Sequence, residues 1–250
     1  MASVAQIRPY EPRDAKDVIF AVGKANMQLL AVANMKAISH PLTLVLWIAM
    51  SSIFVEYMHW WPQGGYGFLG YLSPLPAFAS LAVPILAICD WINRPYFEDL
   101  SQEVLRKPDL QNIPENYKKS PSSGFWLLDF GDKFVGLIAV DASPEEASPA
   151  PRKKSKTSQT SDTAIIRHFY VEEPYRAADI QKDLLQYAVR HVFDSSPTVQ
   201  NIEVITSSLT RYAQKSLHEL GFRVKEETKR VGIFGWKLER RVLERVNWRP

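Results

Sequence analysis

The sequence predicts an α/β (α+β) fold, in which helices flank a mixed twisted sheet and an apolar helical hairpin is inserted near the start. The first observation is the segment 37–89, whose only formal charge is Glu56. The second is the order strand, helix, strand, helix, strand that apolar periodicity indicates from Thr163 onward. The third is a β-hairpin pattern over 125–141. We therefore expect one domain over 1–250, interrupted by a membrane hairpin.

The apolar segment 37–89 divides into two candidate membrane spans. Residues 37–55 and 66–89 each have about the length that a helix needs to cross a bilayer core, roughly 20 residues. Between them, Pro62 and two glycines break the helix, and Trp60 and Trp61 suit a membrane interface. The pattern indicates two helices joined by a short turn.

Positive charges set the expected orientation of this hairpin. Lys and Arg occur on both sides of the hairpin and are absent from its turn, so the positive-inside rule places both flanks in the cytosol. The second span contains Pro74, Pro76 and Pro84, which disturb a helix. A re-entrant loop, a buried amphipathic pair and a hairpin confined to one leaflet are therefore the alternatives to two full crossings.

The first soluble element is a short strand at 6–11. Pro12 then opens a helix, with Asp14 favourably placed at its start, and this helix runs toward the apolar segment. After the hairpin, residues 90–116 have a helical pattern with prolines near the ends. These elements lead into a loop before the next strands.

Two strands joined by a tight turn follow that loop. Residues 125–130 and 133–141 are rich in aromatic and β-branched side chains, and Gly131 with Asp132 forms the turn between them. Residues 143–162 are rich in Pro, Ser, Thr and Lys and contain no large apolar residue, so we expect a disordered basic loop. Its cluster at 152–156 suits either solvent or the anionic surface of a membrane.

The remaining elements alternate between strands and helices. Residues 164–171 and 202–206 are predicted strands, and 222–224 and 230–236 are predicted closing strands. One apolar stripe marks the helix between the first two strands: Ile180, Leu184, Leu185, Ala188, Val189 and Val192. A second helix carries Ala213, Leu217 and Leu220 and ends at Gly221.

Composition excludes several classes of function. The net charge of +3 is too small to indicate a nucleic-acid-binding protein. The single cysteine, Cys89, permits neither a disulfide framework nor a cysteine zinc site, and we expect no metal. Residues 1–18 are polar and charged, so no signal peptide is expected there.

This order of elements resembles the GNAT acyl-CoA N-acetyltransferase fold. The resemblance rests on the hairpin, the strand ending at Val171, the turn 176–180 that opens a helix, and the helix ending in Glu-Leu-Gly-Phe at 219–222. The apolar hairpin follows the first strand and helix. This position is similar to that of the hairpin in the membrane-anchored branch, which includes the cysteine S-conjugate and aspartate N-acetyltransferases. The similarity covers residues 7–240.

The resemblance implies a site for the pyrophosphate of acetyl-CoA at the start of the helix after Val171. Free N–H groups and the positive end of the helix dipole bind phosphate there. The implied cofactor-binding residues are Val171, Arg176, Ala177, Ala178, Asp179 and Ile180. Two of them depart from the family pattern, because Ala177 and Asp179 occupy glycine positions. We expect the Asp179 carboxylate either to compete with phosphate for the N–H groups or to cap the helix.

The catalytic positions implied by the resemblance also depart from the family pattern. Leu217 occupies the position at which many members have a tyrosine that protonates the leaving thiolate, and core packing explains this leucine. His168 and Glu203 are the candidate bases for the amine. By strand alternation His168 lies on the face of Ile166 and Tyr170, where a half-exposed structural histidine is the alternative; for Glu203 the alternative is a solvated side chain.

The function that this resemblance implies is transfer of acetyl from acetyl-CoA to a small amine or a peptide amine. The enzyme is expected in a membrane, in the endoplasmic reticulum, with its catalytic domain in the cytosol and its hairpin in the lipid bilayer. The alternative is a catalytically degenerate GNAT-like protein that serves as an interaction or chaperone platform for a membrane-protein partner. The altered glycines and the missing tyrosine favour this alternative.

Overall fold

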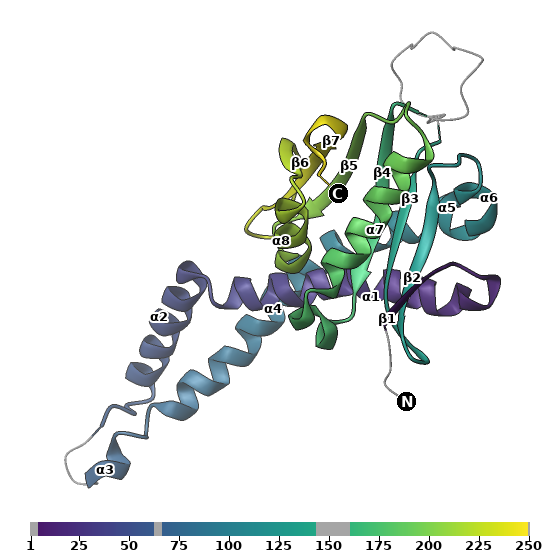
Figure 1. Cartoon of the computed structure of the whole chain (residues 1–250). Helices are drawn as coiled ribbons and strands as arrows, with labels where there is room; N and C mark the ends of the chain where they lie inside the picture. The colour runs from purple at the N-terminus through teal and green to yellow at the C-terminus, as the bar shows by residue number, and fades with distance from the viewer. Residues whose placement is uncertain (1–4, 63–66, 144–160, 250) are drawn as a thin grey trace. The chain divides into compact units, whose positions relative to one another are not determined.

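A computed structural model describes residues 5–62, 67–143 and 161–249 (Figure 1). The expected basic loop at 143–162 falls almost entirely outside the described residues. The strands are β1 Ala5–Pro9, β2 Gly124–Phe130, β3 Lys133–Asp141, β4 Thr163–Val171, β5 Asn201–Ser207, β6 Arg223–Val231 and β7 Trp236–Glu244. The α-helices are α1 Ala15–Ile38, α2 Pro41–Tyr57, α3 Gly67–Gly70, α4 Leu75–Leu105, α5 Pro108–Gln111, α6 Ile113–Tyr117, α7 Ile180–Ser195 and α8 Arg211–Glu219. Short 3-10 helices are η1 Pro12–Asp14, η2 Glu173–Ala178 and η3 Arg245–Asn247.

The described chain divides into two compact units. One consists of residues 1–26, 101–230 and 236–250, and the other of residues 27–100 and 231–235. The first unit contains a seven-stranded mixed sheet in the order β1-β2-β3-β4-β5-β7-β6. Among the described strand pairs, β4 and β5 at the centre of the sheet are parallel, and the other pairs are antiparallel. A mixed sheet with helices on both faces confirms the predicted fold class.

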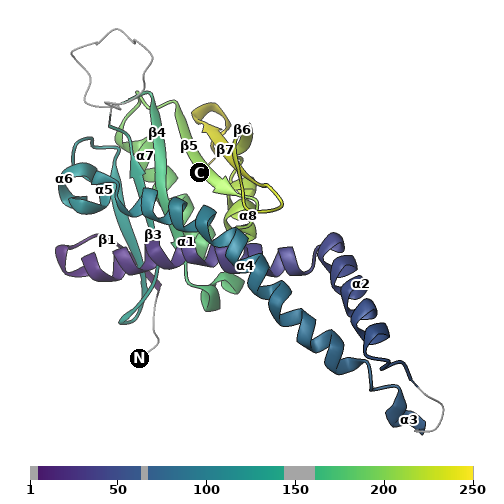
Figure 2. The same cartoon turned by 180° about the vertical axis from the view of Figure 1, so that it is seen from behind.

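Two hydrophobic clusters lie on the two faces of the sheet. One contains the apolar side of α7, including Leu184, Ala188 and Val192, together with Leu217 of α8. The other joins α1 and α6 to the sheet through residues such as Val18 and Tyr117. Figures 1 and 2 show α7 and the first half of α1 on opposite faces. Burial of the α7 stripe and of Leu217 confirms that these residues belong to the core.

The hairpin between β6 and β7 corrects one predicted strand. Residues 230–236 were expected to form a single strand, but β6 ends at Val231 and β7 begins at Trp236. Gly232 and Gly235 between them have φ angles of +75° and +63°, values that glycine adopts without steric cost. The two glycines therefore turn the chain back instead of extending it.

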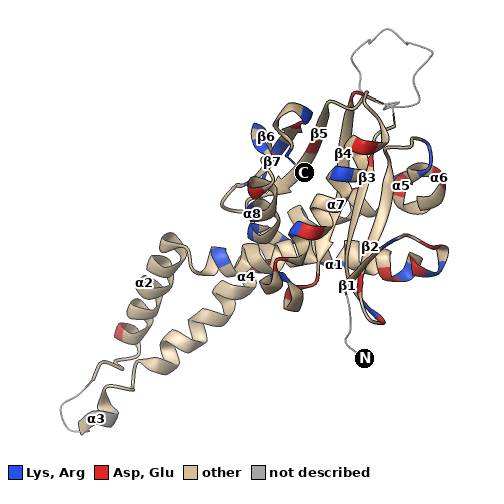
Figure 3. Ribbon diagram, viewed as in Figure 1, with Lys and Arg blue, Asp and Glu red and all other residues tan. Residues whose placement is uncertain are grey.

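The second unit consists largely of apolar helices, and Figure 3 shows how sparse charged residues are along α2 and the adjoining part of α4. The expected span 37–55 is not one helix, because α1 ends at Ile38 and Pro41 starts α2. Proline disfavours helical backbone in the residue before it, and His40 is extended. By contrast, α4 continues through Pro84 and Pro95.

Polar contacts fix the helices of the second unit to one another. The Asn34 amide nitrogen donates to Asp90 at 2.7 Å, and the Asn93 amide nitrogen donates to Asn34 at 2.9 Å. The N–H of Ile233 donates to the Asn93 side chain at 2.9 Å. Two helices, Pro12–Ile38 and Leu75–Leu105, are long and apolar enough to cross a membrane, and α2 is apolar but shorter. Core helices of soluble proteins can share this length and composition.

Candidate functional site

The two parallel strands at the centre of the sheet separate partway along their length. Backbone pairing between β4 and β5 runs as far as Ile166 and Val204, whereas the strands continue to Val171 and Ser207. A gap therefore opens between the carboxyl ends of two parallel strands. In open α/β sheets, ligands bind in the crevice outside the carboxyl ends of the strands.

The backbone groups of β4 that face this gap follow from its pairing with β3. The N–H of Glu172 donates to the carbonyl of Val135 at 2.8 Å, so the peptide groups of Glu172 point toward β3. Peptide groups of successive strand residues point in opposite directions. The N–H and C=O of Val171 and of Phe169 therefore point away from β3, toward the gap.

The carbonyl of Val171 contacts a side chain of the same chain. The Arg176 Nε donates to the carbonyl of Val171 at 2.8 Å. Tyr212 of α8 lies beside Arg176. The Arg176 guanidinium lies over the Tyr212 ring, 4.0 Å from its centroid, and the rings of Tyr212 and Phe169 are 6.4 Å apart. Tyr212 and Arg176 thus meet at the end of β4.

Burial controls the protonation of Tyr212. Desolvation raises the pKa of its phenol above the ordinary value, although the Arg176 charge acts in the opposite direction. The phenol therefore stays protonated at neutral pH. A protonated phenol can donate a hydrogen bond.

The turn that starts α7 has the conformation that a phosphate site needs. Asp179 precedes the helix with φ +53°, in the left-handed region that Asp tolerates better than most residues. This explains how Asp179 can occupy a glycine position. Ala177 and Ala178 are exposed, and Arg176 is half-buried. Small exposed side chains leave the backbone of this turn accessible.

The Asp179 side chain corrects one of the two expectations for this residue. It makes no capping hydrogen bond to the start of α7. Its carboxylate accepts hydrogen bonds from Lys215 on α8 at 3.1 Å and from the Gln181 amide at 3.2 Å. Competition of this carboxylate with phosphate stays a prediction.

A β-bulge corrects the prediction that His168 shares a face with Ile166, whereas the prediction that it shares a face with Tyr170 is confirmed. Ala139 on β3 pairs with His168 and Val140 pairs with Ile166, so Arg167 is an extra residue in β4. One extra residue reverses the faces of the residues that follow it. Ile166 consequently packs in the cluster that contains α7, whereas His168 turns to the other face of the sheet.

On that face His168 is buried in a hydrogen-bonded network. The relative exposures of His168, Asp109 and Tyr117 are 7%, 8% and 5%. Asp109 Oδ2 lies 2.9 Å from His168 Nε2 and accepts the Tyr117 hydroxyl at 3.0 Å. Burial acts to raise the pKa of Asp109, but the hydrogen bonds with His168 and Tyr117 outweigh it and the pKa lies below its ordinary value. The histidine is buried, not half-exposed, and its role as a base stays a prediction.

Glu203 lies in a different network. It pairs with Ile165 in the section where β4 and β5 are still joined. Its carboxylate is 3.0 Å from the Lys225 ammonium and 3.5 Å from the Arg240 guanidinium. As the sequence indicated, its side chain is on the face opposite Ile202, which is buried against α7. The structure does not bring Glu203 together with Arg176 or His168, and its assignment as a base also stays a prediction.

The sequence reasoning missed a carboxylate at the end of β4. Glu172 follows Val171 directly, its side chain is 18% exposed, and its Oε2 lies 2.6 Å from the ammonium of Lys24 on α1. The sequence did contain a signal for this residue, because Glu172 is acidic and directly follows the strand that leads into the predicted binding turn. The contact shows that this carboxylate accepts an alkylammonium group.

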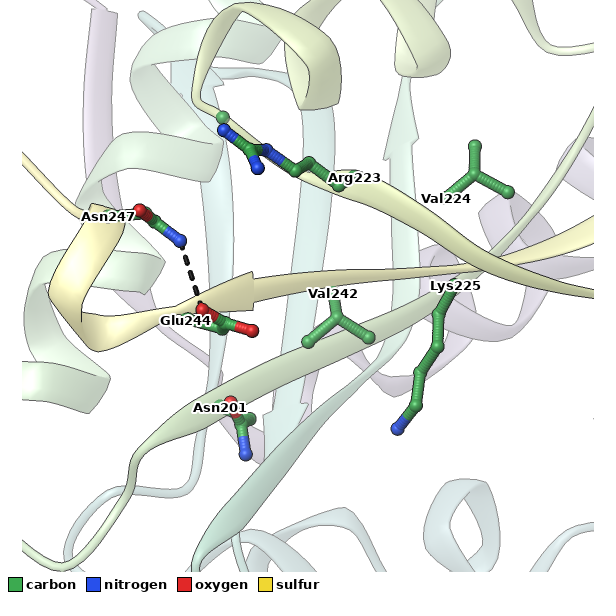
Figure 4. Close-up of a pocket in the computed structure, with 8 residues that line it drawn as sticks. Asn201, Arg223, Val224, Lys225, Val242, Glu244 and Asn247 are labelled. Carbon is green, nitrogen blue, oxygen red and sulfur yellow. Dashed lines mark hydrogen bonds between the residues drawn. The ribbon is translucent and has the colours of Figure 1, made fainter.

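A pocket lies elsewhere on the sheet. Figure 4 shows a pocket of about 320 Å³ lined by Asn201, Arg223, Lys225, Glu244 and Asn247, among others. Asn201 begins β5 and Glu244 ends β7, so the pocket is at the opposite end of β5 from the gap. Among the described residues no three His, Cys, Asp or Glu side chains are grouped so that they could hold a metal ion.

Comparison with known proteins relates the chain to one family. Residues 85–222 match the model of the acetyltransferase (GNAT) family. A GNAT-family acetyltransferase from Streptococcus pneumoniae has 9% identity over 96% of this chain and 99% of its own, with a TM-score of 0.50. No curated protein matches the sequence.

Two further solved structures are of proteins with CoA or a CoA derivative bound. Spermidine N-acetyltransferase from Vibrio cholerae, in complex with CoA and spermine, has 9% identity over 97% of this chain and 96% of its own, with a TM-score of 0.48. Mycobacterium smegmatis RimJ, in complex with CoA-disulfide, has 14% identity over 98% of this chain and 83% of its own, with a TM-score of 0.43.

Proposed function

We propose that this chain, which belongs to the acetyltransferase (GNAT) family, is an N-acetyltransferase that moves the acetyl group of acetyl-CoA to a primary amine. The single observation that carries the site assignment is the divergence of β4 and β5 beyond Ile166 and Val204. It leaves peptide groups of β4 facing a gap that can receive an extended ligand. The Phe169 and Val171 N–H groups are suitably directed to polarise a thioester carbonyl.

The start of α7 is proposed to bind the pyrophosphate of acetyl-CoA. Its N–H groups carry no side-chain cap from Asp179, and the exposed Ala177 and Ala178 permit close approach. Arg176 adds a positive charge beside the turn. The ion pair with Lys215 offsets the charge of Asp179, which is the feature of this turn least suited to an anion.

Glu172 is proposed to receive the acceptor amine. Its contact with Lys24 supports this role, because the carboxylate already accepts an alkylammonium group. The neutral amine nitrogen attacks the thioester carbonyl carbon, forming the C–N bond. The C–S bond then breaks, the electron pair leaves on sulfur, and the CoA thiolate takes up a proton from water. The amine loses its proton to Glu172 and thence to solvent.

The second unit is proposed to anchor the enzyme in a membrane. Apolar side chains of α2 are exposed around the helix, including Leu42, Val45, Leu46, Ile48 and Ile53. On α4 the exposed apolar residues include Leu75, Val83, Leu86 and Ile88. So large an apolar surface is typical of a lipid or protein contact. We infer a hairpin in the lipid bilayer of the endoplasmic reticulum, with the catalytic domain in the cytosol.

The proposed activity is tested by release of free CoA from acetyl-CoA, measured with a thiol reagent and the full chain in detergent. A panel of small primary amines and peptide amines serves as acceptors. We expect amine-dependent CoA release that Glu172→Gln lowers at least tenfold. Glu115→Gln, an exposed glutamate on α6, is the matched control and should retain the activity. Absence of amine-dependent release from the wild type and the control would contradict the proposal.

The second candidate function is a degenerate GNAT-like platform for a membrane-protein partner. Two observations favour it: Leu217, at the position of the family's proton-donating tyrosine, is fully buried, and the carbonyl of Val171 is already engaged by Arg176. On this hypothesis acetyl-CoA does not bind, and the exposed faces of α2 and α4 contact the partner. Binding of acetyl-CoA therefore separates the two candidates.

A further inference from the structure

The contact between Lys24 and Glu172 places an amine of the chain itself at the proposed acceptor position. The Lys24 ammonium on α1 donates to the Glu172 Oε2 at 2.6 Å. The two residues are 148 positions apart in the sequence and belong to the same compact unit. The contact therefore depends on how α1 packs on the sheet.

Buried apolar residues fix α1 at this place. Val18 and Val22 of the helix are buried in one hydrophobic cluster with Tyr170 of β4. Tyr170 and Glu172 are two residues apart, so their side chains extend from the same face of the extended chain. That face is the one on which α1 packs, and one turn of the helix beyond its buried residues is enough to bring Lys24 to the carboxylate.

The carboxylate that holds Lys24 also neighbours the group assigned to the thioester. Glu172 directly follows Val171, whose N–H points toward the gap between β4 and β5. Consecutive Cα atoms are about 3.8 Å apart, so an ammonium bound to Glu172 lies close to a thioester carbonyl placed at Val171. The side chain of Lys24 is 37% exposed, which leaves it accessible to a ligand that enters from solvent.

We propose that Lys24 is a modification site, and that the enzyme transfers acetyl from acetyl-CoA to the Nζ of its own Lys24. The inference rests on the proposed function, because it uses Glu172 as the acceptor site. Glu172 passes the first proton of the Lys24 ammonium to solvent, and the neutral Nζ attacks the thioester carbonyl carbon to form a C–N bond. The C–S bond breaks and its electron pair leaves on sulfur. The nitrogen loses a second proton to Glu172, and the CoA thiolate takes up a proton from water.

Mass spectrometry of the full chain in detergent tests the proposal directly. The protein is incubated with isotopically labelled acetyl-CoA and no added amine, and acetyl is quantified at each lysine, whether labelled or already present. Lys24 should carry about tenfold more acetyl than Lys16, an exposed lysine of the same helix that reports non-enzymatic acetylation. Glu172→Gln should lower acetylation of Lys24 to the level of Lys16, which itself should not change.

Release of CoA without an added amine gives a second measurement. The CoA released by the wild type should equal the label on Lys24 and then stop, because each chain has a single acceptor. Lys24→Arg keeps a positive charge for Glu172 but has no primary amine, so it should release no CoA under these conditions. Lys16→Arg is the matched control and should behave as the wild type. The rate constant should be the same after about tenfold dilution of the protein, as expected of a reaction within one chain.

The possible failures are distinguishable. Acetylation of Lys24 no greater than that of Lys16, while added amines still release CoA, would overturn this inference and leave the acetyltransferase proposal in place. Equal acetylation of Lys24 in the wild type and in Glu172→Gln, or a rate that falls with dilution, would also overturn this inference alone. Neither acetylation of Lys24 nor amine-dependent release of CoA would overturn both.

Discussion

His168 and Asp109 form a buried pair, with the imidazole Nε2 2.9 Å from the carboxylate Oδ2 across 59 residues of sequence. Tyr117 donates to the same carboxylate oxygen, so one acidic side chain joins β4 to α5 and α6. This arrangement gives His168 a structural function that is independent of catalysis. It also leads to the first prediction.

Asp109→Ala should destabilise the fold, because the substitution leaves the buried His168 and the Tyr117 hydroxyl without their acceptor. We expect a loss of about 3 kcal/mol in the free energy of unfolding. At a few degrees per kcal/mol this lowers the melting temperature by about 6 to 12 °C. Thermal unfolding of the full chain in detergent, followed by fluorescence, measures the change. Asp194→Ala, at an exposed position late in α7, should leave the melting temperature nearly unchanged. Equal melting temperatures for both variants would contradict the structural role.

Acid should weaken the attachment of β1 to the start of α1. Hydrogen bonds from Arg8 hold the pKa of Asp14 below its ordinary value of 3.8. A carboxyl whose pKa is lower in the folded state contributes stability above its unfolded pKa, and this contribution is lost as the pH falls through the folded value. The melting temperature should therefore decrease as the pH is lowered from about 5 to about 3.

The variant Asp14→Asn separates this contribution from the remainder of the acid response. Its melting temperature should be lower than that of the wild type at pH 6, and the decrease toward pH 3 should be smaller. The exposed Asp17→Asn is the control and should follow the wild-type curve. Parallel curves for the wild type and Asp14→Asn would show that Arg8 does not lower the pKa of this carboxyl.

Asp179→Gly should strengthen the binding of acetyl-CoA. The substitution removes a negative charge beside the start of α7 and frees Lys215, while glycine adopts the φ of +53° without strain. We expect a gain of about 1 kcal/mol, or about fivefold in the dissociation constant. Titration calorimetry with acetyl-CoA measures it. Arg176→Ala should weaken binding, and an Asp179→Gly protein that binds no acetyl-CoA would argue for the platform function.

The orientation of the hairpin can be tested with an introduced cysteine. Met58→Cys, in a protein whose Cys89 is replaced by Ser, should resist a membrane-impermeant maleimide added to sealed microsomes and react once detergent is added. Asp132→Cys, in the turn between β2 and β3, should react without detergent because that turn is expected in the cytosol. Labelling of both positions in sealed microsomes would contradict two full crossings of the bilayer.

The sequence alone determined local features of the fold: the apolar stripes of helices, a tight turn and a helix end. Alternating and helical apolar patterns depend only on neighbours along the chain, which is why the stripe of α7, the burial of Leu217 and the turn at Gly131 could be predicted. Gly221, with φ +92°, also lies just past the end of α8 as its sequence indicates. Local chemistry is sufficient for each of these features.

The tertiary structure decided the contents of the site. The bulge at Arg167 depends on how β3 and β4 pair, so alternation along β4 alone wrongly placed His168 on the face of Ile166. Its partner Asp109 belongs to a distant helix, and no periodicity in either segment relates the two. Likewise, Tyr212 lies against the Arg176 guanidinium only because α8 follows β5 back to the gap. Such contacts are set by packing between elements, which the local pattern of either element does not specify.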